Sequence, residues 1–498
     1  MGKGDNVFMG NSNGTAAKKT LGSAVVWKFM ERMGVSVVQL VLQLYLARLL
    51  GAERYGELSL MIIFTNLANV FIQRGFNTAL IQNKDVKEED YSSVFWVTMG
   101  IASVLYGILF ISAPLIAVIF DSPNIVLPFR VICLILFPGA LNSIQIAKIS
   151  REMDFRKIFF GNVAGIVISG VVGIVIAHNG GGLWALVAQT LINTTVACIV
   201  MYAQTRIKIK MHVDWERIKV LFSFGWKLLL SSLIDTIYQD IRSIVVGVKY
   251  KKATLGYYDR GKQFPHFIIN AVNLTVQSVM LPAMSDKQDD KSKVKALMKN
   301  SMIISAYTIF PAMAGLAAVA STVVELILGE GWLPCVPYMQ IYCFTFAFYP
   351  VHSCNLQAIN AMGRSDLFLK LEIIKKIMGL IALVISLVFF DSPIAIALTG
   401  VFTTIISCFI NAGPNRKMLN YSYREQFMDI LPSFVYSMIM FCAVYAVQWL
   451  NLGLVLTLIL QIISGVAVYA GISLIFKPVP FRMCMEVLKK RRLKKAGK

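Results

Sequence analysis

Long apolar runs recur along the whole chain, and they constrain its fold more than any other feature. Each run has about 20 residues, the length that a helix needs to cross the hydrocarbon core of a bilayer. Hydrophobic residues make up 57% of the 498-residue chain, charged residues only 15%, and the mean hydropathy is +0.66. Soluble proteins have about 25% charged residues. The sequence therefore excludes an ordinary soluble enzyme and predicts an all-α polytopic membrane protein, because helices satisfy their own backbone hydrogen bonds in lipid.

Counting the apolar runs between polar breaks predicts about 14 transmembrane helices. The first seven expected spans are 24–47, 58–80, 93–119, 126–147, 158–177, 183–204 and 220–247. The other seven are 263–283, 300–328, 335–359, 367–390, 394–412, 430–449 and 453–475.

Positive charge collects in alternate loops, which is the distribution expected of cytoplasmic loops. The opposite loops around 180–182, 329–331, 391–393 and Asn451 contain no Lys or Arg. This pattern predicts a multi-pass protein with both termini in the cytoplasm. It also attributes the net charge of +21 to membrane orientation, with no nucleic-acid partner. One outside loop breaks the rule, since Lys and Arg are frequent between residues 249 and 262.

Two anchors suggest an internal repeat with one spacing. Trp27-Lys28 matches Trp226-Lys227, and a predicted turn at Gly56 matches one at Gly256. Membrane transporters are often built from two related halves. We therefore expect two six-helix lobes around a central cavity, followed by two C-terminal helices. The expected regions are a cytoplasmic tail (1–23), an N-lobe (24–204), an amphipathic cytoplasmic linker (205–219), a C-lobe (220–412), helices 13 and 14 (413–476) and a basic cytoplasmic tail (477–498).

Ionisable residues inside predicted spans are costly in lipid and usually face water or a partner. The first and seventh spans each carry polar residues three or four apart, which places them on one helical face. More positive charge follows in the second span and at the entry to the eighth. We interpret this as a cationic central cavity. Its candidate substrate-binding residues are Lys28, Arg32, Arg74, Lys227, Arg242, Arg260 and Lys262.

Structural roles remain open for several of these charges. Lys28 and Lys227 lie near span ends, where they can extend to the membrane surface. The group Arg32, Asp235, Asp240 and Arg242 can instead form pairs between helices, and Glu31 can neutralise a neighbouring cation. The acidic residues Glu31, Asp235 and Asp240 are also candidates for sensing a coupling ion.

No motif for nucleotide hydrolysis or for a zinc protease is present in the chain. The phosphate-binding pattern GxxxxGK[ST] and the zinc-protease pattern HExxH are both missing. The eight cysteines are single residues, mostly within apolar runs, and none lies beside a His cluster. We expect no catalytic residue, no metal site and no cofactor, and predict that the protein is not an enzyme.

Two segments resemble a known family. Residues 45–85, YLARLLGAERYGELSLMIIFTNLANVFIQRGFNTALIQNKD, are similar to oligosaccharide flippases of the multidrug/oligosaccharidyl-lipid/polysaccharide exporter superfamily. Residues 255–288, LGYYDRGKQFPHFIINAVNLTVQSVMLPAMSDKQ, resemble the second-lobe entry segment of the same family.

The resemblance implies a flippase of the bacterial cytoplasmic membrane. Its expected substrate is an undecaprenyl-diphosphate-linked oligosaccharide, a repeat unit of O-antigen, capsule or exopolysaccharide, moved from the inner to the outer leaflet by alternating access. Expected partners are this lipid-linked oligosaccharide, membrane lipid, a polysaccharide polymerase and glycosyltransferases. Two alternatives stay open, a cation-coupled multidrug exporter of the same superfamily and a non-transporting membrane scaffold for glycan assembly.

Overall fold

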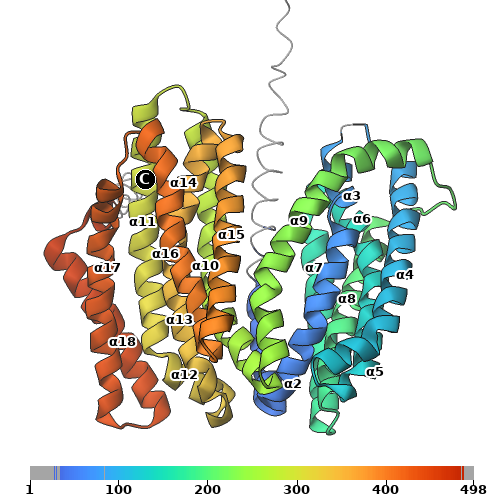
Figure 1. Cartoon of the computed structure of the whole chain (residues 1–498), viewed down its shortest axis with the longest axis horizontal. Coiled ribbons are helices and arrows are strands. Elements are labelled where there is room, and N and C mark those ends of the chain that lie inside the picture. Colours follow the sequence, from blue (N-terminus) through green and yellow to red (C-terminus); the bar gives the residue numbers. More distant parts are fainter. Residues whose placement is uncertain (1–26, 28–29, 31–33, 84, 484, 487–498) are drawn as a thin grey trace, which may run out of the picture. The chain divides into compact units, whose positions relative to one another are not determined.

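The described residues form helices joined by short turns. The computed structural model describes residues 27, 30, 34–83, 85–483, 485 and 486, except for the side chains of Phe224 and residues 271–279. Chain contacts divide it into two compact units, residues 1–248 and 249–498 (Figure 1). The predicted N-terminal tail and most of the C-terminal tail lie outside the described residues.

Unit 1 is a helical bundle whose long helices are interrupted at several points. Its α-helices are α2 (Val35–Gln73), α3 (Phe76–Gln82), α4 (Glu88–Ile119), α5 (Val126–Ile132), α6 (Leu136–Glu152), α7 (Phe155–His178), α8 (Leu183–Thr205) and α9 (Trp215–Lys249). Two short 3-10 segments, η2 (Pro123–Ile125) and η3 (Cys133–Ile135), flank α5. Helix α9 extends to the boundary between the units. The predicted lobe boundary at residue 220 is a different division and stays a prediction.

Unit 2 has a similar order of helices and two more at its end. Its α-helices are α10 (Lys252–Ser285), α11 (Lys291–Ala318), α12 (Ala320–Leu328), α13 (Val336–Ala347), α14 (Tyr349–Ala361), α15 (Ser365–Phe389), α16 (Pro393–Met418), α17 (Tyr423–Ala446) and α18 (Leu454–Phe476). The 3-10 segments η4 (Glu330–Cys335) and η5 (Val447–Leu450) precede α13 and follow α17.

The helices of the two units begin at nearly constant offsets along the chain. Helix α4 corresponds to α11, α6 to α14, α7 to α15 and α8 to α16. The backbone also matches, because α6 ends at Met153 with φ of 55° and α14 is followed by Gly363 with φ of 72°. Both residues adopt the left-handed conformation that ends many helices. The two units therefore share a common order of elements.

The expected turns at Gly56 and Gly256 are wrong, because both glycines lie within helices. The chain bends earlier in each half, at Gly51 within α2 and at Tyr250–Lys251 between α9 and α10. Gly51 has φ of 75°, which a residue with a side chain rarely adopts. The two bends keep the spacing of the repeat. Their positions depend on backbone conformation, which the residue types at Gly56 and Gly256 do not determine.

Nine helical stretches of the described chain are long and apolar enough to cross a membrane, or ten if bent α9 counts as one span. Two predicted spans share the α2–α3 stretch, and the predicted span 335–359 is divided between α13 and α14. Helices α10 and α15 contain several charged residues. The structure is thus an all-helical fold with many candidate spans, and the total of about 14 crossings stays a prediction.

Helices α7 and α8 pack backbone against backbone. Small residues occupy every fourth position of α7, namely Gly161, Gly165, Ser169 and Gly173. A Cβ at Gly165 would lie only 2.6 Å from the carbonyl oxygen of Asn193 on α8. Such small residues allow close helix approach in membranes, where van der Waals packing drives association. The sequence of α7 thereby fixes its partner helix.

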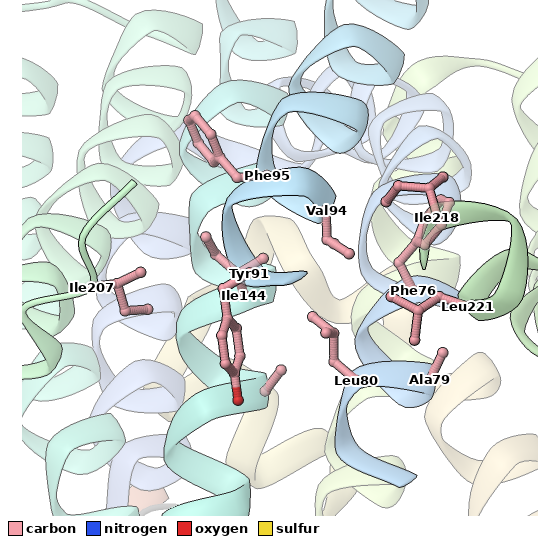
Figure 2. Close-up of a cluster of buried hydrophobic side chains, with 11 residues drawn as sticks. Phe76, Ala79, Leu80, Tyr91, Val94, Phe95, Ile144, Ile207, Ile218 and Leu221 are labelled. Carbon is pink, nitrogen blue, oxygen red and sulfur yellow. The ribbon is translucent and has the colours of Figure 1, made fainter. Parts of the chain in front are cut away.

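The linker between α8 and α9 is bound to unit 1. It is extended rather than helical, and it buries Ile207 while Lys208 stays exposed. Ile207 joins a buried cluster with side chains of α3, α4, α6 and α9, including Phe76, Tyr91 and Ile218 (Figure 2). The linker that was predicted to be amphipathic thus packs Ile207 on protein and leaves Lys208 and Lys210 exposed.

An ion pair fastens the start of α9 to the first turn of α4. Arg217 Nε donates to Asp90 Oδ1 at 3.0 Å, and Arg217 Nη2 donates to Asp90 Oδ2 at 2.6 Å. Asp90 is only 2% exposed and also accepts a hydrogen bond from the backbone N–H of Lys87. We refer to the Asp90–Arg217 contact as the α4–α9 joint.

Unit 2 has a corresponding contact between α11 and α17. Lys295 lies 3.3 Å from a carboxylate oxygen of Glu425, and Lys299 lies 2.9 Å from one of Asp429. Lys295 also donates to the backbone carbonyl of Asn420, just before α17. We refer to these two ion pairs as the α11–α17 joint.

Candidate functional site

Two helix discontinuities meet in unit 1. Helix α2 ends at Gln73 and α3 begins at Phe76, with Gly75 between them at φ of 80°. Helix α9 bends by 52° between its segments 215–223 and 225–249. A Cβ placed on Gly225 would lie 2.8 Å from the carbonyl carbon and oxygen of Gly75, so the two backbones are in direct contact. We call this contact the glycine crossing.

Two predicted cavity cations flank the glycine crossing. Arg74 directly precedes Gly75, and Lys227 follows Gly225 by two residues. Both side chains are exposed, and neither makes an ion pair or a side-chain hydrogen bond with a residue that the structure describes. Broken helices at membrane depth are a recurrent way to build transporter sites. Unpaired cations beside such a break can bind an anionic group through charge-assisted hydrogen bonds.

The predicted polar stripe of the seventh span follows α9 beyond its bend. Lys227, Ser231, Asp235 and Gln239 are all exposed along this helix. Arg242 is half-buried, and its guanidinium carbon lies 5.6 Å from the centre of the Tyr238 ring. The stripe therefore continues the polar surface that begins at the glycine crossing.

The acidic residues of α9 are also engaged. Asp235 is exposed and Asp240 is half-buried, and both of them, like Arg242, interact with neighbouring groups. These interactions are compatible with structural pairing as well as with ion sensing, the two roles left open by the sequence. Both roles remain predictions.

The predicted cations of unit 2 are packed among helices. Arg260 on α10 is 6% exposed, and its guanidinium donates to Gln263. The neighbouring Gly261 contacts α13, where its Cβ would lie 2.6 Å from the Cβ of Tyr338. Lys262 is half-buried. Arg260 thus lies in a close helix contact, a more enclosed position than those of Arg74 and Lys227.

The predicted outside loop between residues 249 and 262, which is rich in Lys and Arg, contains one lysine that forms an ion pair. Lys249 lies 3.2 Å from a carboxylate oxygen of Asp391, in the turn before α16. The same carboxylate accepts a hydrogen bond from the hydroxyl of Tyr250. These contacts give part of the exceptional positive loop a structural role.

The structure brings together only part of the predicted site. Arg74, Lys227, Asp235, Asp240 and Arg242 belong to unit 1, whereas Arg260 and Lys262 belong to unit 2. Lys28, Glu31 and Arg32 lie outside the described residues. The clearest association is therefore that of Arg74 and Lys227 on the two sides of the glycine crossing.

Sequence reasoning missed both glycines of this crossing. The hydropathy does not fall at Gly75, so the predicted span 58–80 gave no sign of a helix break there. A glycine directly after an arginine in mid-span was the available signal, because a positive φ beside a costly charge indicates a special backbone.

A buried polar network in unit 2 was also missed. Asn355 on α14 and Asn415 on α16 are fully buried, and Asn415 Nδ2 donates to Asn355 Oδ1 at 2.8 Å. Asn355 Nδ2 donates in turn to Oε1 of Gln426 on α17 at 3.0 Å. Interhelical amide hydrogen bonds of this kind hold helices together in membranes. The signal was the presence of several amides inside predicted spans.

These features define a multi-pass helical membrane protein with two units of related helix order and an interrupted, cation-bearing helix pair. The chain belongs to the polysaccharide biosynthesis protein family, whose model matches residues 45–337. Both segments that carried the resemblance lie within this match, so the predicted relationship is confirmed.

Curated relatives resemble most of the chain. The teichuronic acid biosynthesis protein TuaB of Bacillus subtilis (strain 168) is 22% identical over 354 residues, 70% of this chain and 73% of that protein. The lipopolysaccharide biosynthesis protein WzxC of Escherichia coli (strain K12) is 21% identical over 444 residues, 88% of each. The succinoglycan biosynthesis transport protein ExoT of Rhizobium meliloti (strain 1021) is 21% identical over 350 residues, 70% of this chain and 71% of that protein.

Solved transporters share the fold. The lipid II flippase MurJ in an inward closed conformation matches with a TM-score of 0.70 and 16% identity, covering 89% of this chain and 98% of that chain. An inward-facing multidrug resistance MATE family transporter of the MOP superfamily matches with a TM-score of 0.57 and 15% identity, covering 84% and 98%. At these identities the likeness establishes the architecture alone.

Proposed function

We propose that this protein moves an undecaprenyl-diphosphate-linked oligosaccharide from the inner to the outer leaflet of the bacterial cytoplasmic membrane. Membership of the polysaccharide biosynthesis family supports this role, as do the names of relatives in the synthesis of lipopolysaccharide, teichuronic acid and succinoglycan. A fold shared with a lipid II flippase is also consistent with it. A polysaccharide polymerase and glycosyltransferases are the proposed partners of the pathway.

The observation that carries the proposal is the pair of cations at the glycine crossing. A diphosphate and its sugars are too polar for hydrocarbon and need a hydrated, positively charged path, while the polyprenyl tail stays in the lipid. Arg74 and Lys227 are exposed, lie on segments in direct contact and have no described ion-pair partner. They can therefore bind the headgroup without first breaking a salt bridge.

The remaining predicted charges extend this path in our proposal. Lys28, Arg32, Arg242, Arg260 and Lys262 are the further headgroup contacts of a central cavity that opens alternately to the two sides of the membrane. Glu31, Asp235 and Asp240 are the candidates for coupling to an ion. Fourteen crossings, two lobes and cytoplasmic termini complete the arrangement as proposals derived from the sequence.

Reconstituted transport tests the headgroup role of the crossing. Proteoliposomes containing only this protein should translocate the lipid-linked oligosaccharide, and Arg74→Gln and Lys227→Gln should each slow translocation by about tenfold or more. A hydrogen bond to a charged group contributes about 1.5–3 kcal/mol, and about 1.4 kcal/mol corresponds to tenfold in affinity. Lys293→Gln is the matched control, because Lys293 is exposed at the start of α11 and already paired with Asp290 at 2.9 Å.

Other outcomes of the same assay discriminate the alternatives. Full transport by both glutamine variants, with normal protein yield, would remove the proposed cationic path. Drug efflux in parallel samples without glycan movement would assign the protein to the multidrug branch. An absence of both activities, with glycan-assembly enzymes still retained on the protein, would indicate the scaffold role.

A further inference from the structure

A narrow groove runs along α4 below the bound linker of unit 1. It has a volume of about 440 Å³, and its walls include Trp96, Gly100, Ile101 and Val104 of α4 with Val213 and Trp215 at the linker end. All the residues that form it are apolar or aromatic. The groove thus begins at the linker and follows α4, a helix long and apolar enough to cross a membrane.

Specific hydrogen bonds hold the linker wall of this groove. The indole N–H of Trp96 donates to the backbone carbonyl of Lys210 at 2.9 Å. The Ser92 hydroxyl accepts from the backbone N–H of Lys210 at 3.1 Å, and the Ser93 hydroxyl accepts from that of Asp214 at 3.0 Å. These contacts give the groove a fixed shape at its mouth.

The dimensions of the groove suit one acyl chain. The ten residues from Trp96 to Leu105 along α4 extend for about 14 Å, which is nine steps of the helical rise per residue. One leaflet contributes about 15 Å of hydrocarbon to a bilayer. The glycine at position 100 opens the floor, since no other atom lies within 4 Å of a Cβ built there.

The mouth of the groove is suited to a membrane surface with negative charge. Met211 is 91% exposed and Trp215 is 64% exposed, and tryptophan favours the level of lipid headgroups. Lys208 is exposed and has no ion-pair partner among the described residues. Lys210 pairs with Glu89 at 3.2 Å, and both side chains are more than half exposed. Asp214 Oδ1 accepts from the backbone N–H groups of Glu216 and Arg217 at the start of α9, so Lys208 is the cation at this rim that no described carboxylate pairs.

We infer that this groove binds one acyl chain of an anionic phospholipid, with the lipid phosphate at Lys208 and Lys210. The linker was predicted to lie on the cytoplasmic side, so the ligand comes from the cytoplasmic leaflet. Anionic lipids of that leaflet attract basic segments. The site concerns a lipid of the surrounding membrane, and it does not depend on which molecule the protein transports.

Lipid retention by the purified full-length protein tests the site. Native mass spectrometry after titration with phosphatidylglycerol should show one tightly retained lipid, and an equal titration with phosphatidylcholine should show retention at least about tenfold weaker. Gly100→Leu should abolish the difference by filling the floor. Gly107→Leu is the matched control on the same helix, because a Cβ there also has no neighbour within 4 Å and Gly107 does not line the groove.

A second pair of variants separates the chain from the headgroup. Val104→Trp fills the groove from a residue that is 63% exposed, so its effect does not rely on Gly100 alone. Lys208→Gln with Lys210→Gln should reduce retention of phosphatidylglycerol to the level of phosphatidylcholine. Equal retention of the two lipids by the wild type, or unchanged selectivity when the groove is filled, would overturn the inference. Displacement of phosphatidylglycerol by equimolar polyprenyl phosphate would also overturn it, since the groove would then bind an isoprenoid tail.

Discussion

The α4–α9 joint and the α11–α17 joint each connect one of the equivalent helices α4 and α11 to the helix that follows α8 or α16, but they have opposite charge. In unit 1 α4 supplies the acid, Asp90, and α9, the helix after the linker, supplies the base, Arg217. In unit 2 α11 supplies the bases Lys295 and Lys299, and α17 supplies the acids. The two halves therefore share an architectural contact without sharing its chemistry.

This reversal has a consequence for folding. If α9 docked on α11, Arg217 would face lysines, and if α17 docked on α4, its acids would face Asp90. Like charges in such contacts select against the wrong partner. In a chain with two similar helical units, opposite polarity directs each late helix to its own unit.

The joints also differ in burial. Asp90 is 2% exposed and binds Arg217 through two oxygens, whereas in the α11–α17 joint Glu425 is 48% exposed and Asp429 is 15% exposed. Exposed ion pairs contribute about 0–1 kcal/mol. Loss of one partner of a buried pair costs about 3–5 kcal/mol because the other charge stays in a low dielectric. We therefore expect the α4–α9 joint to be the more sensitive of the two.

The largest effect should follow from reversing one charge of the α4–α9 joint. Arg217→Glu places a carboxylate against buried Asp90 and should reduce the free energy of unfolding by about 3–5 kcal/mol. Thermal unfolding in detergent and limited proteolysis of the linker measure this change. Lys219→Glu is the control, because Lys219 is exposed two residues further along α9. Equal stability of the two variants would contradict a structural role for the pair.

A milder change should separate the two joints by their burial. Asp90→Asn should lower the free energy of unfolding by about 2 kcal/mol, since Arg217 remains partly buried without its counter-charge. Glu425→Gln should cost at most about 1 kcal/mol, because the lysine opposite it has access to solvent. Denaturant titrations of both variants in the same detergent make the comparison. A larger cost at Glu425 would mean that burial does not determine the strength of these joints.

Salt should produce the smallest difference. Raising the ionic strength to about 1 M shortens the screening length to about 3 Å and weakens exposed pairs more than buried ones. Hydrogen exchange should increase in residues 419–422, beside the α11–α17 joint, and change little in residues 206–214, beside the α4–α9 joint. Similar increases in both segments would show that the two joints are equally open to ions.

The helices themselves could be predicted because their signal is long and local. Predicted spans such as 158–177 and 183–204 differ by only a few residues from α7 and α8. A run of about 20 apolar residues leaves few alternatives in a membrane protein. The bend at Gly51 could not be placed, because a backbone dihedral leaves no trace in hydropathy.

The candidate site was harder to predict than the fold. Periodicity predicted that Lys227, Ser231 and Asp235 share one side of a helix, and all three residues are exposed on α9. It could not show that Arg260 is enclosed beside Gly261, because burial depends on a neighbouring helix far along the chain. Which helix supplies the acid and which the base in each joint could not be predicted for the same reason, since an ion pair joins residues more than 100 positions apart.

The glycine crossing differs from these joints in the kind of sequence change that it permits. The charges of an ion pair can be exchanged by two compensating substitutions, so both of its residues can change together. Gly75 is required by its own dihedral angle, and Gly225 is required by the backbone against which it lies. No pair of compensating substitutions at Gly75 and Gly225 can satisfy both the dihedral requirement and the steric requirement. A side chain at either glycine should therefore disrupt the crossing.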